Sequence, residues 1–169
     1  MRPSHGRIPE LRLREATRAV LLDEFDSILL VKYIFPSGVQ RWGTPGGGLH
    51  PGESHLDGLH RELHEELGLR GAPIGPHIWD RVHVFPMISG EDGQRDRFFL
   101  VRVPRFDPAP TIGWEQMRAE FVHDARWWSL DEIDRTDEAF APAALALHLR
   151  RLLSDGPPTE PVDVSDPRS

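Results

Sequence analysis

Three glutamates in the segment RELHEELG have the spacing of a cluster on one face of a helix. Glu62, Glu65 and Glu66 lie three and four residues apart, and at 100° per residue their side chains span roughly 100° of the helix circumference. The leucines of the same segment fall on a neighbouring stripe, formed by Leu56, Leu59, Leu63 and Leu67. We therefore expect a helix over 54–67 that packs through its leucines and presents negative charge beside them, ended by Gly68.

A cluster of this kind has two interpretations. Like charges at these spacings repel by a few tenths of a kcal/mol per exposed pair, and Arg61 relieves only part of that repulsion. A hard dication would relieve it strongly, because Mg²⁺ prefers oxygen ligands and keeps waters that a phosphate can displace. Three glutamates taken alone more often form a solvated acidic face, so the choice depends on the residues around them.

The residues before the helix extend the glutamates into a longer motif. Residues 47–69 fit the pattern G-x5-E-x7-R-E-U-x-E-E-x-G-U, in which U is aliphatic, without a departure. The matching positions are Gly47, Glu53, Arg61, Glu62, Leu63, Glu65, Glu66, Gly68 and Leu69. The turn that opens the motif also has a physical interpretation of its own, because Gly46, Gly47 and Gly48 allow backbone to approach a diphosphate closely.

This motif resembles the Nudix box, and the chain is identified on it as a member of the Nudix hydrolases. The resemblance implies that Glu62, Glu65 and Glu66 bind a divalent metal, Mg²⁺ with Mn²⁺ as a substitute. It implies that the backbone carbonyl of Gly46 completes the metal shell. It also implies that Arg61 and Glu53 form an ion pair that braces the loop against the helix.

The reaction implied by the resemblance is hydrolysis of a phosphoanhydride bond in a nucleoside diphosphate linked to another moiety. Metal ions would neutralise the diphosphate, acidify a bound water and hold it in line with phosphorus. A carboxylate serves as the base, and relatives differ in which one does. Glu66 is the first candidate within the box; Glu120 lies where many relatives place an extra loop carboxylate, and Glu115 is its rival.

Two points about function stay open at this level. The box does not specify whether the substrate is a nucleoside triphosphate, ADP-ribose, a nucleotide sugar or a similar compound. An alternative from another functional class is a Nudix domain that binds a nucleotide or metabolite without cleaving it. Such domains often lose glutamates of the box, whereas this chain keeps all of them, so the sequence favours catalysis.

Histidines near the motif offer weaker candidates. His60 and His64 have the spacing of a zinc pair, but on the helical wheel they lie away from the glutamates, and solvated positions are the preferred interpretation. His50 and His55 lie closer to the glycine turn, where either could contact a phosphate.

Tryptophans outnumber tyrosines five to one. Trp42 precedes the glycine turn and either stacks on a base or packs in the core. Trp114 either belongs to a lid or anchors its loop. We expect Trp127 and Trp128 to pack beneath the sheet and the last helix.

The elements that must position these residues fit one domain. Strands are expected over 17–23, 27–35, 40–43, 77–85 and 97–103, and a second helix over 138–154. This mixture predicts the α/β (α+β) class, and the resemblance implies an α/β/α sandwich with a mixed central sheet. We divide the chain into an N-terminal arm (1–15), the Nudix domain (16–154) and a proline-rich acidic tail (155–169) that we expect to pack poorly.

The amino-acid composition further restricts the functional classes that fit this chain. The 169 residues include no cysteine, which excludes a disulfide scaffold and a thiolate metal site. Within the family that the motif resembles, the absence of cysteine disfavours the isopentenyl diphosphate isomerase branch, which relies on one. A net charge of −7 argues against binding to duplex nucleic acid or acidic membranes, and no stretch approaches the roughly 20 apolar residues of a membrane helix. We expect a cytoplasmic protein with a small nucleotide or diphosphate as its partner, and the resemblance leaves a homodimer open.

Overall fold

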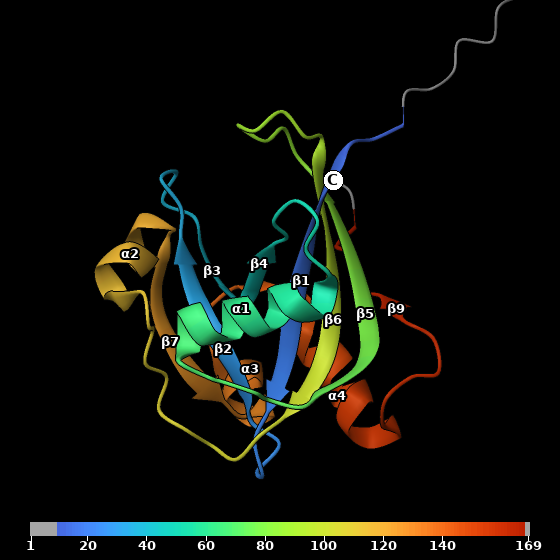
Figure 1. Ribbon diagram of the computed structural model, residues 1–169. Coiled ribbons are helices and arrows are strands. Elements are labelled where there is room, and N and C mark those ends of the chain that lie inside the picture. The colour runs from blue at the N-terminus through green and yellow to red at the C-terminus, as the bar shows by residue number, and fades with distance from the viewer. Residues whose placement is uncertain (1–9, 168–169) are drawn as a thin grey trace, which may run out of the picture.

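The computed structural model describes residues 10–167, so residues 1–9 of the expected N-terminal arm lie outside it, and residues 13–15 begin the first strand. Strands and helices follow one another in the order β1 (Leu13–Leu22), β2 (Ile28–Ile34), β3 (Gln40–Gly43), β4 (Gly46–Gly48), α1 (His55–Leu67), β5 (Ile74–Val84), β6 (Gly93–Arg102), α2 (Gly113–Ala119), β7 (Val122–Trp128), α3 (Leu130–Arg135), β8 (Phe140–Ala141), α4 (Leu145–Asp155) and β9 (Val162–Asp163) (Figure 1). Within the described range, no helix has the length and apolar character needed to cross a bilayer.

The strands form one mixed sheet that opens at one end. Its order is β8-β3-β2-β1-β6-β5-β9, with β4 paired to β1 and β7 paired to β2. β1 runs parallel to β6 along its whole length but pairs with β2 only at Leu22 and Ile28, beside their hairpin. Farther from the hairpin β1 pairs with β4 instead, so β1 and β2 diverge (Figure 1). The glycine turn therefore lies in the opening between them.

Helices cover both faces of this sheet. The leucines of α1 and Met117 of α2 pack with alternate residues of β1, β2 and β6 in one core cluster. The opposite residues of the same strands pack with Ile133 of α3 and with the apolar face of α4 in a second cluster. The two clusters confirm the predicted class and its α/β/α layering.

The helix that carries the glutamates begins one residue later than predicted, with Ser54 as its N-cap, and ends at Gly68 as predicted. The Ser54 hydroxyl accepts a hydrogen bond from the Asp57 N–H at 3.1 Å, and Gly68 adopts φ 71° at the C-terminal end, the left-handed conformation that favours glycine. Leu59, Leu63 and Leu67 are buried. Leu56, expected in the same stripe, is exposed in the first turn, so three leucines hold α1 on the sheet.

The last helix begins later than predicted. Residues 138–144 were expected to be helical, but Phe140 and Ala141 form β8, parallel to β3. Phe140 is buried between the sheet and α4, and burial of its ring at a sheet edge outweighs the helical spacing of the segment. The helix α4 therefore starts at Leu145.

The C-terminal tail packs on the sheet, contrary to the expectation from its composition. β9 pairs in parallel with β5, opposite Trp79 and Asp80, and Val164 is 1% exposed within the core cluster of α4. The free edge of β5 supplies backbone partners and one pocket for an apolar side chain, which composition alone does not reveal.

This packing predicts different effects for the two valines of the tail. Replacing Val164 with alanine removes buried methyl groups and should lower the free energy of unfolding by about 2 kcal/mol. Val162→Ala is the matched control, because Val162 is 41% exposed and its replacement should cost little. Urea unfolding of both variants checks this, and equal destabilisation by the two substitutions would contradict the packing of the tail.

Candidate active site

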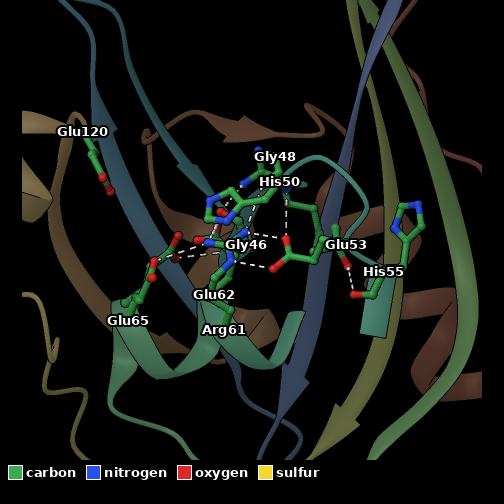
Figure 2. Close-up of polar contacts among 12 residues, drawn as sticks. Gly46, Gly48, His50, Glu53, His55, Arg61, Glu62, Glu65 and Glu120 are labelled. Atoms are coloured by element: carbon green, nitrogen blue, oxygen red, sulfur yellow. Dashed lines mark hydrogen bonds and ion pairs between the residues drawn. The ribbon is translucent and has the colours of Figure 1, made fainter. Parts of the chain in front are cut away.

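An ion pair joins the loop after β4 to helix α1. Arg61 donates from Nε and from Nη2 to the two carboxylate oxygens of Glu53, each at 2.9 Å. Its Nη2 also donates to the carbonyl of Gly48 at 3.2 Å, and the N–H of His50 donates to Glu53 at 3.0 Å. A bidentate pair of this kind fixes orientation as well as distance. The structure thus brings together Glu53 and Arg61, which the motif pairs (Figure 2).

Each member of this ion pair favours the charged form of the other. The hydrogen bonds from Arg61 and from the backbone of His50 lower the pKa of Glu53 from 4.5 to about 2. The same contact with Glu53, together with the charge of Glu62, raises the pKa of Arg61 above its ordinary value. Both groups therefore stay ionised across the physiological range.

The three glutamates of α1 lie beside the same arginine but have different partners. Nη1 of Arg61 donates to Glu62 at 3.0 Å and to Glu65 at 3.4 Å. Glu66 is 5% exposed and accepts a hydrogen bond from the N–H of Gly46 at 3.3 Å. Burial, the charge of Glu62 and a hydrogen bond with Glu62 raise the pKa of Glu66 well above its ordinary value. Glu62 and Glu66 are therefore in contact, while Glu65 is the more exposed member.

The glycine turn leaves no room for side chains at this site. A Cβ atom on Gly47 would lie 2.7 Å from a carboxylate oxygen of Glu62, and one on Gly46 would lie 2.0 Å from the carbonyl oxygen of Thr17. Gly46 also has φ +137°, which L side chains rarely adopt. Glycine is thus required at position 46 by the approach of β4 to the backbone of β1, whereas a side chain at position 47 would displace the carboxylate of Glu62. The approach of a diphosphate to this turn stays a prediction.

The donor set suits a hard divalent cation. Two carboxylates in contact need a proton or a cation between them, and oxygen donors are those that Mg²⁺ and Mn²⁺ prefer. Glu62 and Glu66 would hold such an ion, with Glu65 beside them. Within residues 10–167 no three acidic or histidine side chains already converge around one point. The carbonyl of Gly46 accepts a hydrogen bond from Arg18 at 3.3 Å, which leaves its second lone pair for a metal.

Arg18 is a site residue that the sequence analysis missed. Its Nη1 donates to the carbonyl of Gly46 and to the hydroxyl of Tyr33, at 3.3 and 2.9 Å, and its Nε donates to Asp96 at 3.1 Å. Burial opposes its charge, but Tyr33 and Asp96 outweigh burial, so the pKa of Arg18 lies above its ordinary value. The signal in the sequence was one arginine inside the apolar strand segment TRAVLL.

Trp42, a candidate for base stacking, lies in the core. It is 4% exposed and packs on the α3 and α4 face of the sheet, opposite to α1. Its ring meets the ring of Trp128 edge-on at 5.2 Å. Core packing, the alternative weighed for Trp42, is therefore its role in the structure.

Glu120 and Glu115 remain apart from the glutamates of α1. Glu120 follows the last turn of α2, is exposed, and accepts a hydrogen bond from Gln116 at 3.4 Å. Figure 2 shows it to one side of the cluster, without a contact to the other residues drawn. Glu115 lies in the first turn of α2 and is exposed. Trp114 of the same helix is partly buried against the core, which favours loop anchoring over a lid.

The two histidines near the loop differ in their surroundings. The side chain of His55 lies 3.9 Å from Glu15 and beside the ring of Phe99, and Figure 2 shows it directed away from the glutamates. A phosphate contact is therefore not supported for His55. His50 is exposed at the loop, on the side of Glu53.

Comparison with known proteins agrees with this geometry. A family model described as NUDIX domain matches residues 12–149. The RNA pyrophosphohydrolase of Shewanella sp. (strain W3-18-1) is 33% identical over 104 residues, which are 54% of this chain and 58% of that protein. That of Helicobacter pylori (strain G27) is 39% identical over 69 residues, 37% of this chain and 44% of that protein. The match spans about half the length of these curated relatives.

Solved structures share the fold. The NUDIX domain of Shewanella oneidensis NrtR, in a complex with ADP ribose, has a TM-score of 0.63 at 20% identity and covers 88% of this chain and 93% of that one. The MutT protein from Methanosarcina mazei Go1 has a TM-score of 0.62 at 17% identity and covers 86% of this chain and 99% of that one. At these identities the likeness concerns the architecture alone.

The depressed pKa of Glu53 predicts a pH-dependent contribution to stability. Its ionised form is favoured in the folded state, so the contribution is complete above pH 4.5 and declines as the pH falls toward about 2. The difference in unfolding free energy between the wild type and Glu53→Gln, measured by urea unfolding, should shrink over that interval. In an Arg61→Met background the same difference should change clearly less over that interval, because only the N–H of His50 then favours the ionised form. An equal pH dependence with and without Arg61 would contradict the pairing.

Proposed function

The chain belongs to the NUDIX domain family, and we propose that it is a Mg²⁺-dependent pyrophosphohydrolase that cleaves a phosphoanhydride bond in a nucleoside diphosphate linked to another moiety. The observation that carries the proposal is that two carboxylates of α1 face the same glycine turn: Glu66 accepts the N–H of Gly46 at 3.3 Å, and Glu62 lies against Gly47. A buried pair of carboxylates costs free energy unless something between them offsets their repulsion, and a functional dication supplies that offset.

In the proposed reaction, the role of each residue follows from its position in the site. When bound, a divalent cation neutralises the diphosphate and acidifies a water molecule. Glu62 and Glu66 of α1 would hold the ion, and Arg61 fixes the loop to α1 through Glu53. Gly47 and Gly48 present backbone rather than side chains to the diphosphate. We retain Glu66 as the general base within the motif, with Glu120 as the alternative outside it.

The substrate class is broader than any one nucleotide. The curated relatives are named RNA pyrophosphohydrolases, and the NrtR domain binds ADP ribose in its solved complex. A suitable panel therefore contains nucleoside triphosphates, ADP-ribose, a nucleotide sugar and an RNA with a 5′-triphosphate. Binding of a panel member without turnover would favour the non-catalytic sensor instead. A cytoplasmic location stays a prediction of the sequence, which leaves the oligomeric state open.

Substitution of the central glutamates tests the proposal. Glu62→Gln and Glu66→Gln each remove a charged metal ligand while keeping side-chain volume, so Mg²⁺-dependent turnover should fall at least ~100-fold. Release of phosphate or pyrophosphate from the panel measures this, and a chelator should abolish turnover by the wild type. Asp57→Asn is the matched control, because Asp57 is an exposed acid on the same helix and its replacement should leave turnover within about twofold. Near-normal turnover by both glutamine variants would overturn the assignment.

A second pair of variants tests the base outside the motif. If Glu120 completes the site when substrate is bound, Glu120→Gln should lower kcat by about 10²-fold or more, whereas Glu115→Gln should leave it nearly unchanged. Steady-state kinetics on the best substrate of the panel distinguishes them. Full activity in Glu120→Gln would leave Glu66 as the general base. Loss of activity in Glu115→Gln alone would identify Glu115, rather than Glu120, as the base outside the motif.

A further inference from the structure

A row of alternating charges leads from the glycine turn to the C-terminal segment. Arg18 contacts the carbonyl of Gly46 and pairs with Asp96 at 3.1 Å. The second carboxylate oxygen of Asp96 lies 3.8 Å from Nη1 of Arg81. Nη2 of Arg81 pairs with Asp166 at 3.0 Å. The two arginines and two aspartates therefore form one row with balanced charge.

Asp166 is held in place by the segment that contains it. The N–H of Val164 donates to the carbonyl of Asp80 at 2.8 Å, and the N–H of Val82 donates to the hydroxyl of Ser165 at 2.8 Å. The carboxylate of Asp166 also accepts a hydrogen bond from the N–H of Ala143 at 2.8 Å. The tail is thus fixed to β5 on one side and to the turn before α4 on the other.

The two side chains in the middle of the row have little contact with solvent. The side chain of Asp96 is 3% exposed and that of Arg81 is 14% exposed. Within residues 10–167 the Nε of Arg81 is buried without a hydrogen-bond partner, so its charge depends on the two aspartates. Burial raises the pKa of Asp166, but Arg81 and the Ala143 N–H outweigh that effect, so its pKa lies below the ordinary value and it stays charged. Without that charge, Arg81 has only the second carboxylate oxygen of Asp96 as a partner, 3.8 Å away, and a shift of Arg81 and Asp96 toward each other would draw Asp96 away from Arg18.

We propose that Asp166 is a positioning residue: through Arg81 and Asp96 it keeps Arg18 against the carbonyl of Gly46, so the C-terminal segment sets the geometry of the catalytic turn. The expected effect on turnover rests on the proposed function, because it requires that the chain be an active hydrolase. The link from Asp166 to Gly46 is a property of the protein itself and can be measured without a substrate.

Asp166→Asn tests the role, because the amide oxygen can still accept the Ala143 N–H while the charge facing Arg81 is lost. We expect kcat to fall roughly tenfold with KM within about twofold, measured well below the thermal midpoint of the variant. Asp163→Asn is the matched control: Asp163 lies in the same segment and accepts the N–H of Ser165 at 2.9 Å, away from the row. Its kcat should stay within about twofold of the wild type.

A double-mutant cycle separates positioning from general destabilisation. Arg18→Lys combined with Asp166→Asn should lower kcat little beyond Arg18→Lys alone, because both changes disturb the same contact at Gly46. Arg18→Lys combined with Asp163→Asn should show additive effects. Additivity in both pairs would overturn the proposal.

A substrate-free readout distinguishes this inference from the proposed function. In ¹⁵N NMR spectra, Asp166→Asn should move the Arg18 Nε–H signal and the amide signal of Gly47, and Asp163→Asn should move neither. Unmoved signals overturn the inference, as does an unchanged kcat in an enzyme whose signals have moved. If the wild type cleaves no member of the panel, the proposed function fails, and the signals alone decide whether Asp166 acts on Gly46.

Discussion

The close approach of Gly46, Gly47 and Gly48 to β1 is the constraint on which the rest of the site depends. These residues pair with Arg18, Thr17 and Ala16 at distances that exclude a side chain on Gly46. The pairing pulls β4 away from β3 and into the opening between β1 and β2. Because Arg61 then ties the following loop to α1, the position of the glutamates relative to the sheet is set by this backbone contact.

The acidic cluster lies between two arginines with different roles. Arg61 lies on α1 itself, reaches toward the loop and offsets the charges of Glu53, Glu62 and Glu65. Arg18 approaches from the sheet and contacts the backbone that Glu66 also contacts. This distribution keeps several carboxylates close together in a partly buried place without full neutralisation, which is the electrostatic condition for binding a further cation.

The sequence predicted the residues whose roles follow from local spacing. The helix α1 and its Gly68 end were predicted from local spacing, because helix ends depend on residues close in the chain. The pairing of Glu53 with Arg61 was expected from the resemblance of residues 47–69 to the Nudix box, and the structure contains it. The late start of α4 was not predicted, and the sequence left stacking and core packing open for Trp42. Both outcomes follow from the parallel pairing of Trp42 with Phe140, two residues almost a hundred positions apart.

The sequence by itself thus determined the family, the layered α/β class and the glutamates of the motif, since their spacing carries the chemistry in one short segment. Only the tertiary structure decided that Arg18 reaches Gly46, that Glu120 stays apart from the cluster and that the proline-rich tail packs on β5. Those contacts join segments far apart in the chain. Their free energy comes from burial and from charges that meet only after the sheet has formed, and no local pattern encodes it.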